Sequence, residues 1–148
     1  MARSRSTMLE SEINGLLAHE LRSQDLLVLQ NVRIHPCELD IVALDTFTLR
    51  LVNVEIKRAD WRALLNQAIR GTFYCHYSVA ALPAPLRAVV PEEEFRGRGI
   101  GLLYFEPGEH GVSWTLGVQP AMSTKLNRPL KRLLYSRFYA RYGDGVYA

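Results

Sequence analysis

The segment from Leu49 to Asp60, LRLVNVEIKRAD, constrains the fold of this chain more than any other. Read as a β-strand, it places three apolar side chains on one face and Glu55 and Lys57 on the other. Its apolar flanks favour a central strand, whereas an exposed pair on an edge strand is the alternative. In a central strand both charges lose hydration, which is costly. We therefore expect a bound group that offsets this cost.

The composition is that of an ordinary globular chain. Its 148 residues are 48% hydrophobic and 22% charged, which predicts a single domain over residues 1–148. Cys37 and Cys75 form neither a disulfide framework nor a zinc-binding spacing, although a single bridge stays open. No apolar run is long enough to cross a bilayer, and the first residues lack the apolar centre of a signal peptide. We therefore expect a cytoplasmic protein with no membrane partner.

The charge favours a nucleic-acid partner. The formal net charge is +3, and arginine provides most of the basic side chains. A guanidinium group forms a planar fork that suits phosphate. Arginine-rich surfaces also occur on proteins that bind no nucleic acid, so the charge alone leaves the partner open.

Apolar spacing and turn residues predict the elements of the first half. Residues 7–21 read as a helix, with Thr7 as its N-cap and Glu10 completing a capping box. Three strands follow, and their short connections predict an antiparallel meander. These strands cover residues 26–34, 38–44 and 49–57.

The second half adds two helices and a hairpin. Asp60 caps a predicted helix over residues 61–77, and a strand follows at residues 78–83. Strand, helix and strand in succession predict a right-handed crossover, and hence one parallel pair in an otherwise antiparallel sheet. A polar connector, a hairpin and a final helix opened by Asn127 cover residues 87–99, 100–118 and 127–142. The predicted fold is α/β, a mixed sheet with a helix before it, a crossover helix and a C-terminal helix.

Two carboxylates and a lysine converge on one face of this sheet. Asp40 lies in the second strand, two residues after Glu38 and on the same face. If the second and third strands pair as a hairpin, Asp40 comes close to Glu55 and Lys57. Such a group suits a hard divalent cation, because Mg²⁺ prefers oxygen ligands and keeps waters for substrate phosphates. Lys57 would help to neutralise the ligand pair and orient a water.

Two helices extend this candidate site. On a helical wheel, Glu10 falls on the core-facing side of the first helix. Gln67, Arg70 and Tyr74 recur at i, i+3 and i+7, and predict a polar stripe that touches a backbone phosphate or the site itself. A capping-box role for Glu10 and a solvated helix face for Gln67 are the alternatives, and both stay open.

The order of these residues resembles the PD-(D/E)xK nuclease superfamily, which has a restriction-endonuclease-like fold. The opening LESEINGLLAHEL looks like the first helix of archaeal Holliday-junction resolvases, and residues 54–83 are similar to small MmcB-like DNA-repair members. The resemblance covers roughly residues 7–120. Pro36 stands four residues before Asp40, whereas many members place proline directly before the aspartate. The matching residues are Glu10, Asp40 in ELD, Glu55 and Lys57 in EIK, and Gln67 in NQAIRGTFY.

The resemblance implies a role for each matching residue. Asp40 and Glu55 would bind Mg²⁺, which Mn²⁺ can replace, together with the carbonyl oxygen of Ile56. Lys57 would position the attacking water. Glu10 would support the metal shell and Gln67 would help to hold the site or the DNA. Two alternatives stay open, namely Glu12 in place of Glu10, and Glu38 beside Asp40.

Basic side chains elsewhere are candidates for contacts with phosphates. RGRGIG, from Arg96 to Gly101, lacks the strand-to-helix setting and the Lys-Ser/Thr pair of a phosphate loop, so we expect a mobile basic loop. The charges of the final helix spread around its wheel, which predicts a packed helix with one phosphate-touching edge, or else a solvated face. The predicted DNA-binding residues are Arg70, Tyr74, Arg96, Arg98, Arg128, Lys131 and Arg132.

Together these features predict a Mg²⁺-dependent DNA endonuclease in repair, recombination or mobile-element biology. The expected partner is DNA, with RNA left open, and no organic cofactor is expected. A homodimer or a higher homo-oligomer would allow two strands to be cut. The alternative is a catalytically inactive nuclease-fold protein that binds DNA or a partner protein. The intact set of Asp40, Glu55 and Lys57 favours the enzyme.

Overall fold

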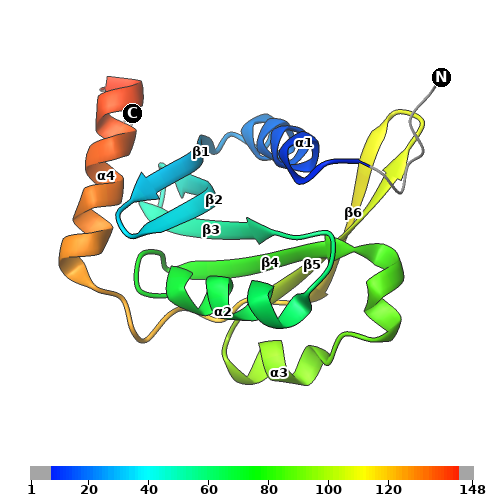
Figure 1. Cartoon of the computed structure of the whole chain (residues 1–148). Coiled ribbons are helices and arrows are strands. Elements are labelled where there is room, and N and C mark those ends of the chain that lie inside the picture. The colour runs from blue at the N-terminus through cyan, green and yellow to red at the C-terminus, as the bar shows by residue number, and fades with distance from the viewer. Residues whose placement is uncertain (1–7, 144–148) are drawn as a thin grey trace.

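One mixed sheet organises the chain, with six strands in the order β1-β2-β3-β4-β5-β6. The computed structural model describes residues 8–143, and Figure 1 shows helices on both sides of the sheet. The strands are β1 (Leu27–Ile34), β2 (Cys37–Asp45), β3 (Arg50–Ile56), β4 (Tyr77–Pro83), β5 (Gly101–Gly108) and β6 (Gly111–Val118). The helices are α1 (Glu10–Ser23), α2 (Trp61–Gly71), α3 (Glu92–Gly97) and α4 (Arg128–Tyr142), with the 3₁₀ helix η2 (Ala84–Ala88). The predicted α/β class with a mixed sheet is confirmed.

The pairing of the strands differs from the prediction at one place. Strands β1, β2 and β3 form the expected antiparallel meander, and α2 crosses over to β4, which is parallel to β3. β5 and β6 form the expected hairpin. The prediction of one parallel pair is wrong, because β4 and β5 are parallel as well. The chain between them passes through η2 and α3, and parallel strands need a crossover of this kind.

The helices divide between the two faces of the sheet. Ile13 of α1 packs with Val54, whereas Phe138 of α4 packs with Leu51 on the opposite face. Leu64 of α2 lies in a third cluster with residues of β4 and β5. Because side chains alternate along a strand, β3 is apolar on both faces and lies under α1 on one side and under α2 and α4 on the other.

The start of α1 corrects the predicted capping box. The N-cap residue is Leu9, whose N–H donates to Glu12 Oε1 at 3.4 Å, while Thr7 lies outside the described residues. The capping glutamate is therefore Glu12. Glu10, the first residue of the helix, is left to interact elsewhere.

The crossover helix ends earlier than predicted. Asp60 caps α2 as expected, since its Oδ1 accepts from the N–H of Ala63 at 3.2 Å. The helix stops at Gly71, and the chain then turns so that the N–H of Cys75 donates to the carbonyl of Gly71 at 2.9 Å. A helix continuing to residue 77 would carry Tyr74 and Cys75 away from the core cluster under α4, in which both are buried.

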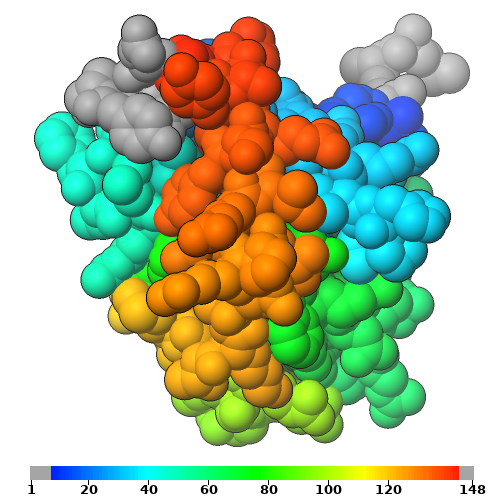
Figure 2. Space-filling model, turned by 90° about the vertical axis from the view of Figure 1, so that its left-hand side faces the viewer, coloured from blue at the N-terminus to red at the C-terminus, as the bar shows by residue number. Residues whose placement is uncertain are grey.

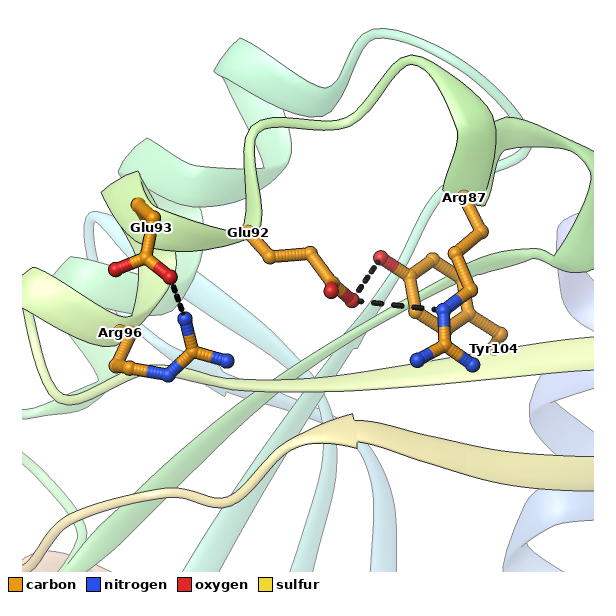
Figure 3. Close-up of polar contacts among 5 residues, drawn as sticks. All are labelled: Arg87, Glu92, Glu93, Arg96 and Tyr104. Carbon is orange, nitrogen blue, oxygen red and sulfur yellow. Dashed lines mark hydrogen bonds and ion pairs between the residues drawn. The ribbon is translucent and has the colours of Figure 1, made fainter.

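Polar contacts fasten α3 and η2 to β5, as Figure 3 shows. The hydroxyl of the buried Tyr104 donates to Glu92 Oε2 at 2.8 Å, and Arg87 Nε lies 3.7 Å from the same carboxylate oxygen. The Arg87 guanidinium also stacks over the Tyr104 ring, 5.1 Å from its centroid. On the outer side of α3, Arg96 pairs with Glu93.

The basic segment from Arg96 to Gly101 is not the mobile loop that was expected. Arg96 and Gly97 close α3, Ile100 is fully buried, and β5 begins at Gly101. This segment therefore links two packed elements.

Helix α4 covers one side of the molecule. Figure 2 shows it running down the middle of that side, between the β2–β3 turn and the β1–β2 hairpin. Asn127 caps it as predicted, with Oδ1 accepting from the N–H of Leu130 at 3.1 Å. The hydroxyl of Tyr142 donates to the carbonyl of Val28 at 2.7 Å and anchors the other end. Within residues 8–143, no helix is long and apolar enough to cross a membrane.

Candidate functional site

Glu55 is a buried carboxylate in the interior of the sheet. It lies in β3, between β2 and β4, and its side chain is 2% exposed. The alternative of an exposed pair on an edge strand is therefore wrong. Extending the register that pairs Ile41 with Val54 by one residue places Asp40 opposite Glu55. Residues that face each other across a strand pair point to the same side, so the two carboxyl groups lie together.

Asp40 is held where the β2–β3 ladder ends. Its Oδ2 accepts from the N–H of Ile56 at 2.8 Å. Its backbone carbonyl accepts from Asn14 Nδ2 at 3.0 Å. These bonds fix the aspartate at the point where the pairing of β2 with β3 ends.

Burial and the neighbouring carboxylate hold Glu55 in its protonated form. Burial and, after it, the charge of Asp40 together raise the pKa of Glu55 from the usual 4.5 to about 9. Hydrogen bonds with the backbone of Asp40 and the side chain of Asn53 lower the pKa of Glu55, but by less than burial and the charge of Asp40 raise it. Two adjacent carboxyl groups cannot both ionise without a nearby positive charge. A bound cation would supply that charge and would favour the ionised form of both groups.

Two buried side-chain oxygen acceptors make no hydrogen bond among the described residues. They are Asn53 Oδ1 and Gln67 Oε1. Asn53 lies two residues before Glu55 on the same face of β3, and Gln67 comes from α2, which packs against β3 and β4. Buried acceptors are normally satisfied, so a water or another bound group with a donor would complete this part of the fold.

The donor set therefore fits Mg²⁺. Within residues 8–143, no group of three His, Cys, Asp or Glu side chains is placed to hold a metal ion. Mg²⁺ does not need such a cage, since it is usually bound by one or two carboxylates and several waters. Asp40, Glu55 and the carbonyl of Ile56 offer that kind of incomplete oxygen shell.

Glu10 approaches this site from α1. Its Oε1 accepts from the N–H of Arg58 at 3.3 Å, so it reaches the segment just after β3. A cavity of about 180 Å³ lies between α1, the middle of β1 and β2, and the end of β3, and is lined by Glu10, Ser11, Asn14, Asn31, Asp40 and Ile56. The wheel-based expectation of a core-facing Glu10 is wrong, because the side chain is exposed at the helix start. It faces the cavity instead.

Asn14 is a site residue that was not predicted from the sequence. It is buried, and its amide joins α1 to two strands through Asp40, Asn31 and Gln30. The signal was present, because Asn14 interrupts the apolar face of α1 directly after Ile13. A polar residue on a buried helix face needs partners, and here these lie around the cavity.

Lys57 follows Glu55 by two residues and is half-buried. Its backbone N–H donates to the carbonyl of Ala81 at 3.1 Å, which continues the parallel pairing with β4. In the part of the chain that the structure describes, its ammonium group makes no hydrogen bond or ion pair. The charge is therefore available at the edge of the site.

The predicted polar stripe on the crossover helix does not form. Gln67 and Arg70 lie on α2, Arg70 exposed, but Tyr74 follows the end of the helix and is buried. Burial and contact with Cys37 raise the pKa of Tyr74 to about 12. The prediction of Tyr74 as a DNA-binding residue is therefore wrong.

The other predicted DNA-binding residues lie away from the carboxylates. Arg96 and Arg98 precede β5, and Arg128 opens α4 beside Phe73, so all three are near the starts of the parallel strands. Asp40 and Glu55 lie near the other end of β3, a strand of seven residues or roughly 20 Å. Lys131 and Arg132 follow on α4, Lys131 with its Nζ 5.9 Å from the ring centroid of Tyr135.

Glu38 forms an ion pair outside the candidate site. Its carboxylate lies 3.5 Å from Arg33, on the exposed part of the β1–β2 hairpin. The structure therefore gives Glu38 a partner other than Asp40.

Comparisons with known proteins bear on the fold. No protein-family model matches the sequence, and none of the curated proteins does. A Silicibacter pomeroyi protein of unknown function has a similar structure, with a TM-score of 0.63 at 17% identity over 95% of this chain and 88% of that one. A repair endonuclease from Pyrococcus abyssi has a TM-score of 0.52 at 17% identity over 72% of this chain and 50% of that one. At such identities the likeness shows the fold alone, a mixed α/β fold also found in a repair endonuclease.

Proposed function

We propose that this chain is a Mg²⁺-dependent DNA endonuclease of the PD-(D/E)xK type. The observation that carries the proposal is the pair of Asp40 and Glu55, placed opposite each other where β2 and β3 separate. Burying this pair destabilises the fold unless a cation binds there, and a nuclease is a protein that needs such a site. The fold shared with a repair endonuclease is consistent with the proposal.

The chain's own residues have distinct tasks in this reaction. Asp40, Glu55 and the carbonyl of Ile56 would hold Mg²⁺, which in phosphodiester hydrolysis stabilises charge on the phosphate oxygens and on the attacking water. The ammonium of Lys57 would orient that water for in-line attack and stabilise the negative charge that develops. Glu10 faces the same cavity and would accept a hydrogen bond from a water at its rim.

The substrate and assembly follow from this proposal. DNA is the partner, Mn²⁺ would replace Mg²⁺, and no organic cofactor is needed. A homodimer or a higher homo-oligomer would place two sites on two strands. The enzyme would act in repair, recombination or mobile-element biology.

The test is cleavage of labelled single-stranded, duplex, flapped and four-way-junction DNA with Mg²⁺, Mn²⁺ or EDTA. Asp40→Asn and Lys57→Met are expected to lower the rate by about 10²-fold or more, because each removes a charge from the reacting centre. Glu38→Gln is the matched control, since Glu38 lies two residues from Asp40 on the same strand but pairs with Arg33. It is expected to keep the wild-type rate.

Two results would contradict the proposal. One is cutting that is unaffected by EDTA, or that Asp40→Asn and Glu38→Gln reduce equally. The other is the absence of cutting on every substrate while DNA binding stays the same in all variants. The second result would identify a catalytically inactive nuclease-fold protein that binds DNA.

A further inference from the structure

A second and larger cavity lies at the same end of the sheet as the candidate site. It measures about 600 Å³, and its walls come from the start of α1, the segment after β3, the end of β4 with η2, and β5. Most of the lining is apolar, with Leu86, Pro85 and the ring of Phe105 among its walls. Arg58 and Glu106 are the charged residues that line it.

This cavity is joined to the candidate site through Arg58. The residue follows Lys57 directly, and its N–H donates to Glu10 Oε1 at 3.3 Å, the carboxylate that lines the smaller cavity. Its guanidinium donates to the carbonyl of Met8 at 3.3 Å, on the rim of the larger cavity. The guanidinium has further N–H groups that can bind another acceptor.

The two cavities are also close across the sheet. Ile56 of β3 lines the smaller cavity, while Phe105 and Glu106 of β5, two strands from β3, line the larger one. Ile56 and Phe105 lie in the same core cluster under α1, so both cavities are on that face of the sheet. Two strand spacings amount to roughly 10 Å. A nucleotide that neighbours the cleaved phosphodiester can therefore reach the larger cavity.

We propose that the larger cavity receives an unpaired nucleobase of the DNA substrate. The inference rests on the proposed function and specifies its substrate. A nucleobase has a flat apolar ring and a polar edge, and proteins bind such a base by stacking apolar side chains and guanidinium planes on its faces and hydrogen-bonding to its edge. Here the apolar walls match the ring, and Arg58 and Glu106 provide a donor and an acceptor for the edge.

The consequence is a preference for DNA that contains an unpaired base next to the cut. Extruding a base from an intact duplex costs stacking and pairing energy, which a mismatch, bulge or flap has already lost. We therefore expect such substrates to be cut about tenfold or more faster than perfect duplex when the DNA concentration is too low to saturate the protein.

The test uses DNA in which 2-aminopurine replaces one base at successive positions around a mismatch, bulge or flap. This base fluoresces more strongly when it leaves the stack. The full-length Asp40→Asn protein is used, so that binding is measured without cutting. We expect the fluorescence to rise at one position near the unpaired site and at no position of the perfect duplex.

Two variants that fill the cavity from different segments of its lining complete the test. Ala59→Trp and Pro85→Trp replace exposed residues of its lining, whereas Ala88→Trp, outside the cavity but also exposed, is the matched control. Each filling variant, checked for an unchanged circular dichroism spectrum, is expected to lose the fluorescence rise and the tenfold preference. Ala88→Trp is expected to keep both.

The outcomes separate this inference from the proposed function. Metal-dependent cutting with no fluorescence rise, or with a preference that both filling variants retain, would overturn the nucleobase site and leave the nuclease intact. The cavity would then be open to another occupant, such as an apolar peptide. A fluorescence rise lost in both filling variants, without any cutting by the wild type, would support the nucleobase site while the nuclease proposal fails.

Discussion

At the scale of single residues, Glu55 links the stability of the protein to pH. Burial and the charge of Asp40 hold its pKa near 9 in the folded state, against about 4.5 in the unfolded chain. Between these values the folded protein keeps a proton that the unfolded chain has released. Without a metal ion, the free energy of unfolding should therefore fall as the pH rises from about 4.5 to about 9, by up to about 1.4 kcal/mol per pH unit.

The measurement is urea denaturation of wild type and Glu55→Gln at pH 6, 7 and 8 in EDTA. Glutamine has a similar shape and cannot ionise, so the variant should lack the slope and become the more stable protein at pH 8. Added Mg²⁺ should stabilise the wild type at pH 8 and release protons, because ligand carboxyl groups bind metal in their ionised form. A difference between the two proteins that does not change with pH would contradict this account of Glu55.

Asn14 supports the candidate site from α1, and its loss should be measurable in stability. The amide donates to the carbonyl of Asp40 at 3.0 Å and accepts from Gln30 Nε2 at 2.8 Å. Asn14→Ala leaves these partly buried partners unpaired and is expected to cost about 1–3 kcal/mol in urea denaturation. Asn66→Ala, at an exposed position of α2, is the matched control and should be neutral or stabilising by a few tenths of a kcal/mol, because alanine is the better helix former. Equal losses in both variants would argue against a supporting role for Asn14.

The residues differ in how far the sequence could place them. Strand alternation was sufficient to put Glu55 and Lys57 on one face, because a period of two allows only two faces. Helical spacing could not place Tyr74 in the same way. It assumes that the helix continues, and α2 ends three residues earlier. Asn14 was missed because its partners Asp40 and Gln30 are distant in the sequence and become neighbours only in the folded sheet.

At the scale of elements, Gly71 determines how closely α2 approaches the sheet. A Cβ at this position would lie 2.1 Å from Asn53 Nδ2 and 2.9 Å from Ser78 Oγ. Gly71→Ala should therefore displace α2 or Asn53, and we expect a loss of about 1–3 kcal/mol. The control is Gly15→Ala in α1, where a Cβ would meet nothing within 4 Å.

Urea denaturation of the two glycine variants gives the comparison. Gly15→Ala should stabilise the protein by roughly 0.5–1 kcal/mol, because alanine is the better helix former. Stabilisation by both substitutions would show that α2 is not packed as closely on Asn53 as the structure indicates.

The elements themselves were largely predictable because their signals are local. Alternating apolar residues gave the meander, and Asp60 and Asn127 gave the helix starts through side-chain caps that the structure contains. The second parallel pair was not predictable in the same way. It depends on the path of η2 and α3 along the sheet. The hydrogen bond between Tyr104 and Glu92 holds α3 against β5. No periodic pattern in the sequence links these two residues, so the contact could not be predicted.

At the scale of the whole molecule, the predicted charges separate into two regions. Asp40 lines the smaller cavity and lies with Glu55 near the end of β3. Arg98 and Arg128 lie near the starts of the parallel strands. The sequence predicts one site for both, because spacing along a chain does not show which end of a sheet a residue reaches. DNA that touches both regions would have to extend over roughly 20 Å of the surface.

This separation predicts that DNA affinity and the chemical step can be changed independently. The variant Arg128→Ala/Lys131→Ala/Arg132→Ala removes three positive charges from α4, the helix that Figure 2 shows on the surface. We expect weaker binding of DNA and a smaller salt dependence, with the slope of log K against log salt reduced by about 0.9 for each lost phosphate contact. The kcat at saturating DNA should stay unchanged, because the reacting phosphodiester is distant.

Fluorescence anisotropy at several salt concentrations and steady-state cleavage kinetics test both parts of this prediction. Arg22→Ala, which removes a charge from α1 outside the regions proposed to contact DNA, is the control for a general effect of charge and should leave the salt slope unchanged. Glu55→Gln should show the reverse pattern, with cleavage lost and the salt slope retained. If the triple variant lowers kcat and leaves the slope at its wild-type value, α4 does not contact phosphates, and DNA must reach the carboxylates across another surface.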